Sequence, residues 1–371
     1  MEKLKKRLFS LDVFRGITIA GMILVNNPGS WKYIYPPLKH ADWNGWTPTD
    51  LIFPFFLFIV GVSIAYSLSL RIERGDKKNK IFLKILTRTL ILFFLGLFLH
   101  AFPNFNLSEL RIPGVLQRIA ICYLFASVIF LMMDKKGLIL TTFGLLIIYW
   151  VLMKIVPVPG IGAGVLIPEG NLAAYIDNLV FHGHRLYRGT WDPEGILSTL
   201  PAIGTVLFGV LTGIWLSSSI SSLNKTVGML AGGSLGIILG YIMNIWFPIN
   251  KNLWTSSYVV LTAGLALVFL ALIYWLCDVK GVRFWAKPSI VFGMNSIAVY
   301  FLSGILSRLL SIIKITLQDS TKISIHNWIY RNFFASWAGP FNGSLFFALS
   351  YVFFWLGIMT IFYRRKIFIK I

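Results

Sequence analysis

The segment from His40 to Asp50 gathers ionisable and amide side chains directly before a long apolar run. Imidazole titrates near neutral pH, so His40 could act as a general base, and Asp42 or Asp50 could orient its ring. A simpler interpretation makes His40 an interfacial residue packed against the neighbouring tryptophans. Asp50 also has a simpler interpretation, because with Thr47 it could cap the helix that follows. The segment is therefore a candidate proton-transfer site with a structural alternative.

Two further polar pairs lie at the end of one apolar run and within another. Asn26 and Asn27 close the first run, where they could end a helix or offer amide donors to an oxyanion or a polar substrate. Gln117 and Arg118 lie early in the fourth run, and an arginine at the centre of a membrane helix costs about 2.5–3.5 kcal/mol. Arg118 could extend its charge to the membrane surface, or the pair could bind an anion or a carbonyl group.

Acidic residues and histidines gather in the longest polar segment. Asp192 and Glu194 precede the sixth apolar run, where they could form a turn and a helix start or bind a cationic or hydroxyl-rich ligand. His182 and His184 have the look of two metal ligands, but no third ligand lies near them in the sequence. We therefore predict no metal site.

Other charged groups lie at the opposite ends of the apolar runs. Asp12 and Arg15 are one helical turn apart, which predicts an ion pair between them. The basic stretch 71–88 includes Lys84 and Arg88, and it predicts contact with anionic lipid or with a phosphate-bearing cofactor.

The composition predicts the elements that must hold these residues. Hydrophobic residues make up 57% of the 371 residues and charged residues only 13%, whereas soluble proteins have roughly 25% charged residues. Long apolar runs in lipid must be helices, because a helix satisfies its backbone groups within one segment. Asn295 and Ser296 are polar inserts in the ninth run, where hydrogen bonding between helices is the default expectation. We predict an all-α polytopic membrane protein with about ten transmembrane helices, near residues 11–28, 50–70, 81–102, 114–133, 137–156, 199–217, 226–247, 255–277, 290–312 and 345–363.

The net charge of +20 is best explained by topology. With the N-terminus inside, the inner segments hold 19 Lys and Arg residues and the longer outer segments hold 10. Cytoplasmic loops carry such an excess, so we predict both termini in the cytoplasm and no nucleic-acid partner. His40 then lies outside, and the long outer loops are 28–49, 157–198 and 313–344. Both cysteines lie in apolar runs, so no disulfide is implied, and one membrane domain, 1–371, accounts for the chain.

Seven short motifs occur in a fixed order. They are Leu11-Asp-Val-Phe-Arg-Gly16, the turn at Asn26, His40-Ala-Asp-Trp-Asn-Gly45, Asp50-Leu-Ile-Phe-Pro54, Pro113-Gly-Val-Leu-Gln-Arg118, Asp192-Pro-Glu-Gly195 and Gly293-Met-Asn-Ser296. Each is weak alone, but the ordered set resembles the heparan-α-glucosaminide N-acetyltransferase family and its bacterial relatives, from about residue 7 to the C-terminus. By this resemblance His40 matches the family's essential histidine, Asn26 its nearby asparagine and Asp50 an acid of the same motif.

The family transfers acetyl from acetyl-CoA, supplied in the cytoplasm, to the amine of a terminal glucosamine across the membrane. The resemblance implies an acetyl-CoA-dependent enzyme of the bacterial cytoplasmic membrane, with outward-facing site loops and with an amino sugar and membrane lipids as partners. His40, Asn26 and Asp50 would be catalytic. The sugar would contact Asn27, Trp43, Asn44, Trp46, Gln117, Arg118, Trp191, Asp192 and Glu194. Acetyl-CoA would contact Arg15, Lys84, Arg88, Asn295 and Ser296.

Several alternatives stay open at this stage. Eukaryotic members have an extra luminal region and a preceding span, and we expect this chain to correspond to the catalytic membrane domain alone, which leaves the acceptor open. Transfer could occur directly in a ternary complex or through acetyl-His40. A transporter of a small sugar and an O-acetyltransferase of envelope glycans are the competing functions. The sequence also leaves open the route of CoA and the choice between monomer and homodimer.

Overall fold

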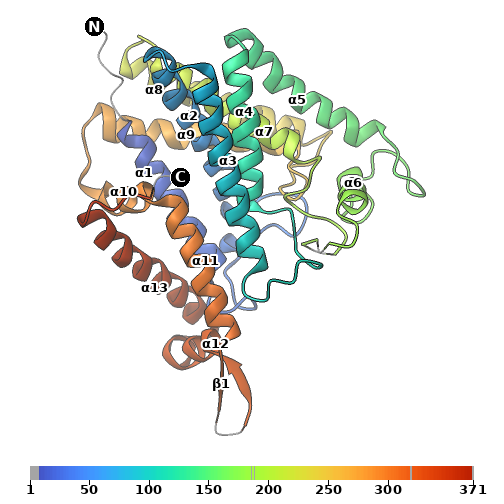
Figure 1. Ribbon diagram of the computed structural model, residues 1–371, viewed down its shortest axis with the longest axis vertical. Coiled ribbons are helices and arrows are strands. Elements are labelled where there is room, and N and C mark those ends of the chain that lie inside the picture. The colour runs from blue at the N-terminus through green and yellow to red at the C-terminus, as the bar shows by residue number, and fades with distance from the viewer. Residues whose placement is uncertain (1–7, 185, 188, 318–319, 370–371) are drawn as a thin grey trace. The chain divides into compact units, whose positions relative to one another are not determined.

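The computed structural model describes residues 8–184, 186–187, 189–317 and 320–369. Some basic residues that enter the topology argument, among them those in residues 1–7, lie outside this part. In the described part, nine helical segments are long and apolar enough to cross a membrane, and a bent pair of helices would add a tenth (Figure 1). The prediction of an all-α polytopic membrane protein is confirmed.

The described chain forms two compact units. The large unit holds the described residues of Met1–Ser10 together with Ala41–Trp46 and Pro54–Gly281. Most of α2 (Ile52–Glu73) belongs to it. Its other elements are α3 (Lys78–Ala101), α4 (Val115–Met132), α5 (Lys135–Ile155), α6 (Leu172–Val180), α7 (Thr199–Ser217), α8 (Ser222–Met243), α9 (Ser256–Tyr274) and the π-helical turn η3 (Trp275–Val279).

The small unit holds Leu11–His40, Thr47–Phe53 and the described residues of Val282–Ile371. Most of α1 (Phe9–Asn26) belongs to it. Its other elements are the 3₁₀ turns η1 (Pro36–Leu38), η2 (Pro48–Leu51) and η4 (Phe284–Ala286), the helices α10 (Lys287–Met294), α11 (Ser296–Ile312), α12 (Ile325–Ile329) and α13 (Ser336–Arg364), the π-helical turn η5 (Tyr330–Ala335), and the strands β1 (Lys314–Thr316) and β2 (Lys322–Ser324).

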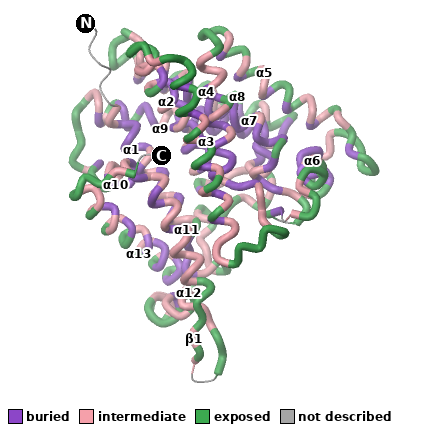
Figure 2. The backbone as a smooth tube through the Cα atoms, viewed as in Figure 1, coloured by how far each residue is buried: buried purple, intermediate pink, exposed green. Residues whose placement is uncertain are grey.

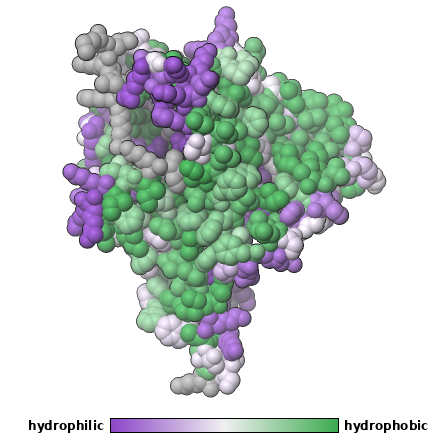
Figure 3. Space-filling model, in the orientation of Figure 1, coloured by the Kyte–Doolittle hydropathy of each residue, from purple (hydrophilic) through white to green (hydrophobic). Residues whose placement is uncertain are grey.

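Burial separates the central helices of the large unit from those at its periphery. In α7, 72% of the most apolar stretch of the helix is buried inside the protein. The corresponding share is 28% in α3 and in α5, and 22% in α8 (Figure 2). Apolar residues that protein does not cover must be covered by lipid. The face drawn in Figure 3 is accordingly mostly hydrophobic.

The central pair α2 and α7 pack backbone against backbone. A Cβ added to Gly61 would lie 1.9 Å from the carbonyl oxygen of Val206, and one added to Gly209 would lie 2.0 Å from that of Phe58. Small residues allow helices in lipid to approach this closely, and close packing replaces the hydrophobic effect that drives association in water. This close packing fixes α2 and α7 against each other, and with them the residues that precede α7 and follow α2.

The helices α10 and α11 form the bent pair, with an angle of 71° between them. The break falls at Asn295, whose backbone leaves the helical region. α10 packs closely against α1. A Cβ added to Gly16 of α1 would lie 1.6 Å from the carbonyl oxygen of Ser289, and one added to Gly293 of α10 would lie 2.3 Å from that of Asp12. The pair therefore corresponds to the ninth predicted span, but with a sharp bend at its polar insert.

The segment predicted as an outer loop at 313–344 contains regular structure. β1 and β2 pair antiparallel, with Ile315 opposite Ile323, and helix begins again at Ile325. The final candidate span runs from Ile325 to Arg364 and is kinked at Gly339, which has a φ of 76° and precedes Pro340. Glycine and proline give this stretch the composition of a loop, although most of it is helical. The predicted loop 157–198 likewise contains α6.

Candidate active site

The His40 imidazole is oriented by Asp50. Its Nδ1 lies 2.6 Å from Oδ1 of Asp50, and the Asp50 side chain is only 1% exposed whereas that of His40 is 45% exposed. A carboxylate at Nδ1 accepts a proton there, so a neutral ring carries its lone pair on Nε2. This arrangement of an exposed imidazole and a buried carboxylate suits a general base that becomes transiently charged.

Asp50 also begins the helix that follows. It is the third residue after Thr47, and its Oδ2 accepts a hydrogen bond from the Thr47 N–H at 3.0 Å, which forms a capping box at η2. Both interpretations of Asp50 from the sequence are therefore realised at once, one by each carboxylate oxygen.

The backbone before His40 is tied to the same turn. The Thr47 hydroxyl donates to the Lys39 carbonyl at 2.5 Å, and the Thr49 hydroxyl donates to the Pro37 carbonyl at 3.1 Å. Because both carbonyls belong to the chain that leads into His40, the imidazole has a fixed backbone as well as a fixed ring orientation.

Asn26 and Asn27 lie in the small unit with His40 and Asp50, at the end of α1. Asn26 is exposed, whereas Asn27 is buried and donates from Nδ2 to the carbonyl of Ile23 at 2.7 Å. The next turn is held by α13, because the Gly29 N–H donates to the Ser344 carbonyl at 3.1 Å. Asn26 can therefore offer an amide to a ligand, and Asn27 is used to end the helix.

The predicted carboxylate pair Asp192 and Glu194 lies in the large unit and is bound by Arg111. Arg111 Nε and Nη2 donate to the two oxygens of Asp192, both at 2.7 Å, and Nη2 also donates to Glu194 Oε2 at 2.6 Å. The Asp192 side chain is fully buried and also accepts from the N–H groups of Tyr187 and Glu194, at 3.1 and 3.0 Å. Asp192 therefore organises this loop.

Charge in this cluster follows from burial and pairing. Burial lowers the pKa of Arg111, but the hydrogen bond to Asp192 and the charge of Glu194 outweigh it, so the pKa is raised and the guanidinium stays charged. Burial raises the pKa of Glu194 against the opposing charge of Arg111.

Three aromatic rings adjoin the cluster. The indole rings of Trp43 and Trp191 meet edge to face at 5.1 Å, and Tyr187 lies 6.0 Å from Trp191. The Arg111 guanidinium lies over the Tyr187 ring at 5.1 Å. Of the predicted sugar-binding residues, Trp43, Trp191, Asp192 and Glu194 are therefore grouped in one region.

Trp46 and Asn44 are held by other parts of the large unit. Trp46 Nε1 donates to the Tyr241 hydroxyl at 3.2 Å, and Asn44 Oδ1 accepts from Asn250 Nδ2 at 3.1 Å. The Gly45 N–H donates to the Ile249 carbonyl at 2.7 Å. The segment 41–46 is thus anchored by its own polar groups.

Gln117 and Arg118 are buried in α4. Arg118 Nη2 donates to the Gly195 carbonyl at 2.9 Å and to the Ser198 hydroxyl, and the guanidinium lies over the Trp254 indole at 5.2 Å. Its Nε and Nη1, and both amide atoms of Gln117, have no hydrogen-bond partner among the described residues. Arg118 therefore fixes the start of α7 and keeps donors for a ligand or water.

A further carboxylate, Asp177 of α6, lies behind the same loop. Its Oδ1 accepts from the Ile196 N–H at 2.8 Å, and its Oδ2 would lie 1.8 Å from a Cβ at Gly195. Burial raises the pKa of Asp177 to about 7, assisted by the negative charge of Asp192 and opposed by the Ile196 hydrogen bond. Gly195 is required here because any side chain would strike this carboxylate.

Two comparisons with known proteins bear on identity. A family model described as the catalytic part of heparan-alpha-glucosaminide N-acetyltransferase matches residues 7–178. The chain is 34% identical to the heparan-alpha-glucosaminide N-acetyltransferase of Homo sapiens, across 81% of this chain and 53% of that protein. The corresponding values for the protein of Mus musculus are 33%, 79% and 53%. The chain belongs to the heparan-α-glucosaminide N-acetyltransferase family. It spans about half the length of these curated relatives.

The family match divides the predicted site residues. Asn26, His40, Asp50 and the pair Gln117 and Arg118 lie within residues 7–178. Those that follow residue 178 lie in the further part of the chain that only the comparison with the whole relatives reaches. They are Trp191, Asp192, Glu194, Asn295 and Ser296.

The residues predicted to bind acetyl-CoA have varied surroundings in this family member. Arg15 donates to Asp12 at 3.1 Å, which confirms the predicted ion pair. Lys84 is exposed. Arg88 lies over the Tyr123 ring at 4.7 Å.

Asn295 binds the end of the described chain. It is buried, donates from Nδ2 to the Ile367 carbonyl at 3.1 Å and accepts from the Ile369 N–H at 2.9 Å. Ser296 is the first residue of α11. Arg15, Asn295 and Ser296 belong to the small unit, and Lys84 and Arg88 to the large unit.

Sequence reasoning missed Arg111 and Asp177. Arg111 entered only as an outer-loop charge, and Asp177 did not enter at all, because their partners are 81 and 19 residues away along the chain. The available signal was Gly195 in a motif with two acids, since a glycine there indicates close approach of another group. Among the described residues, no group of three His, Cys, Asp or Glu side chains is arranged to hold a metal ion.

Proposed function

We propose that this protein is a membrane-bound acetyltransferase that moves acetyl from acetyl-CoA to the amine of a glucosamine-type sugar. The proposal rests chiefly on the His40–Asp50 pair, an oriented and exposed base on a buried carboxylate, in a chain of the heparan-α-glucosaminide N-acetyltransferase family.

The chemistry assigns one role to each residue. The acceptor amine must be neutral to attack the thioester, and Nε2 of His40 takes the proton that the nitrogen loses as the new C–N bond forms. Asp50 stabilises the imidazolium, which then gives its proton to the CoA sulfur as the C–S bond breaks. Such a base contributes about 10²–10⁴ in rate. Asn26 donates to the tetrahedral oxyanion, a contact that contributes about 2.7–4 kcal/mol.

Acetyl-His40 offers a second order of events. Nε2 of the neutral ring would attack the thioester first, CoA would leave, and the amine would then take the acetyl group from the imidazole. Incubation with labelled acetyl-CoA and no acceptor distinguishes the two routes, because only the second leaves label on the protein.

The acceptor is proposed to bind at the cluster of the large unit. The indoles of Trp43 and Trp191 suit the apolar face of a sugar, and Glu194 suits its hydroxyl or ammonium groups. Asp192 serves by holding Arg111 and the loop, and Gln117 and Arg118 supply buried donors nearer α7. Asn27, Asn44 and Trp46 then act through the segments that they fix.

The donor is proposed to enter from the cytoplasm. Arg15, Lys84 and Arg88 are the cations proposed to meet the CoA phosphates, and the helix break at Asn295 and Ser296 is the proposed polar point on its path. Both termini would be cytoplasmic and the His40 loop would face outward, in a bacterial cytoplasmic membrane. Lipid surrounds the spans.

The test is acetyl transfer by the purified protein. Labelled acetyl-CoA is incubated with a panel of glucosamine-containing acceptors, using wild type, His40→Ala and, as a matched control, His182→Ala, which removes an exposed histidine of another loop. We expect wild-type transfer from the control and a loss of about 10²–10⁴-fold from His40→Ala. Unchanged turnover in His40→Ala refutes the assigned base. A base-labile, O-linked acetyl product would show that the acceptor group is a hydroxyl and not an amine.

The bent pair α10–α11 favours one other class of function. Broken helices near polar residues occur in transporters, although these usually have two in corresponding halves. A transporter would move a sugar across vesicle membranes without acetyl-CoA. If the protein shows such flux but neither transfers acetyl nor binds CoA, it is a transporter and the proposed enzyme activity is wrong.

A further inference from the structure

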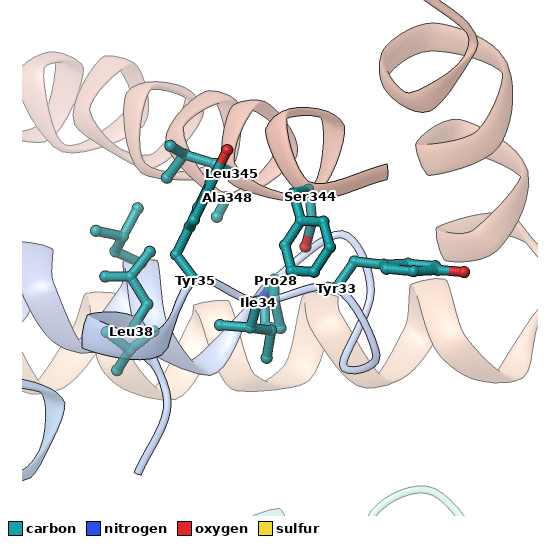
Figure 4. Close-up of a pocket in the computed structure, with 11 residues that line it drawn as sticks. Pro28, Tyr33, Ile34, Tyr35, Leu38, Ser344, Leu345 and Ala348 are labelled. Atoms are coloured by element: carbon teal, nitrogen blue, oxygen red, sulfur yellow. The ribbon is translucent and has the colours of Figure 1, made fainter. Parts of the chain in front are cut away.

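A small cavity lies in the same unit as His40, between the end of α1, the chain leading to His40 and the N-terminal half of α13 (Figure 4). Its volume is about 10 Å³, which is room for the centre of roughly one water- or methyl-sized group. Its walls come from three places: Leu24, Val25 and Pro28; Tyr33, Ile34, Tyr35 and Leu38; and Phe341, Ser344, Leu345 and Ala348.

Most residues that line this cavity are apolar, and the hydroxyl of Ser344 is hydrogen-bonded to the backbone of Ser30. Tyr35 extends from the chain before η1 toward Leu345 and Ala348 of α13 (Figure 4). Its hydroxyl donates to Asn342 Oδ1 at 2.6 Å, and its ring packs on Phe341 at 5.6 Å. The phenol oxygen is thus satisfied outside the cavity, and the ring presents carbon to its interior. An apolar group is the occupant that such walls favour.

The chain places both proposed reactive residues beside these walls. Val25 and Pro28 line the cavity, and Asn26 lies between them. Leu38 also lines it, and His40 follows two residues later, so their Cα atoms are at most about 7.6 Å apart. The two residues proposed to act on the acyl carbon are thus close neighbours, along the chain, of residues that line the cavity.

We propose that this cavity seats the methyl end of the transferred acyl group and restricts the donor to acetyl. This inference rests on the proposed acetyltransferase function. The carbonyl carbon lies at the mouth, within reach of the groups on Asn26 and His40, and the methyl fills the apolar space. A longer acyl chain would have to displace the side chains that line this small space, among them Tyr35 and Leu345. One methylene is commonly discriminated by about 10–200-fold in pockets of this kind.

The experiment compares kcat/KM for acetyl-, propionyl- and butyryl-CoA with one amino-sugar acceptor. Wild type is expected to prefer acetyl over propionyl by about 10-fold or more. Leu345→Ala enlarges the cavity, and the ratio of propionyl to acetyl is expected to rise by about 10-fold. Leu356→Ala on the same helix does not line the cavity and is expected to keep the wild-type ratio.

The ratio is internal to each preparation, so it does not depend on the fraction of protein that folds. Ile34→Ala, on another wall, is the second variant if Leu345→Ala gives no folded protein. A wild-type ratio in both cavity variants, with acetyl transfer intact, overturns the acyl site and leaves the proposed function standing. Absence of transfer from every acyl-CoA by wild type overturns the proposed function and the acyl site with it.

Discussion

Replacing Asp50 by asparagine tests the central pair, because the two side chains have the same shape and differ in acceptors. Oδ1 of Asp50 accepts from His40 Nδ1, and Oδ2 accepts from the Thr47 N–H at 3.0 Å and from the Thr47 hydroxyl at 3.2 Å. Asparagine has a single oxygen for the donors on these two sides. The Thr47 N–H is always a donor, whereas the imidazole can change tautomer. The oxygen of the introduced amide is therefore expected to turn to Thr47, and its NH₂ group to His40.

The size of the effect follows from this geometry. Facing an NH₂ group, Nδ1 becomes the acceptor and the proton of the neutral ring moves to Nε2, where the base is needed. Loss of a hydrogen bond to a charged group removes about 1.5–3 kcal/mol, which is about 10- to 150-fold in rate. The wrong tautomer extends the loss to about 10⁴-fold, as in the corresponding change of a Ser-His-Asp triad. Because the cap is kept, thermal stability should hardly change.

The assay measures kcat for acetyl transfer and the thermal unfolding midpoint of the same preparations. Asp42→Asn is the matched control, since Asp42 is an exposed aspartate of the same motif. We expect wild-type kcat from this control and a fall of about 10²–10⁴-fold from Asp50→Asn. If Asp50→Asn folds and keeps kcat within about threefold of wild type, Asp50 does not set the tautomer and the argument fails.

Two further predictions concern the large unit. Arg111→Met leaves the fully buried Asp192 without its partner and is expected to lower the free energy of unfolding by about 3–5 kcal/mol, measured by denaturation in detergent, whereas Arg111→Lys should lose less. Asp177 has a folded-state pKa of about 7, above its value of 3.8 in an unfolded chain, so its ionisation opposes folding. The contribution of protonated Asp177 to the free energy of unfolding is present at low pH and is lost as pH rises toward 7. Relative to Asp177→Asn, wild type should therefore gain thermal stability as pH falls from 8 to 5.

Either result can contradict the structure. Equal stability of wild type and Arg111→Met would mean that Asp192 finds other partners. Parallel melting curves of wild type and Asp177→Asn across this pH range would mean that Asp177 does not titrate there.

The spans could be predicted because the bilayer sets their length, and about 20 apolar residues are visible without tertiary information. The Asp12–Arg15 pair was visible for a similar reason, since a helix brings residues three apart together. The helical character of residues 325–338 was hidden by Gly339 and Pro340, which end a helix in most contexts and here only kink one.

The candidate site was visible only in part. The alternatives for Asp50 could not be separated from sequence because the two carboxylate oxygens make both contacts at once, one with His40 and one with Thr47. The pairing of Arg111 with Asp192 and Glu194 depends on how two loops meet, and no local pattern records that. The aromatic contact of Trp43 with Trp191 crosses 148 residues in the same way.

One consequence of the capping box reaches beyond catalysis. The carboxylate that contacts the imidazole is also the group that starts η2, so a chain in which this turn has not formed has no oriented imidazole at position 40. If His40 is the base, as we propose, molecules in which this turn is unfolded would be inactive. Substitutions that disturb the beginning of the second span would then lower the specific activity as changes of His40 itself would.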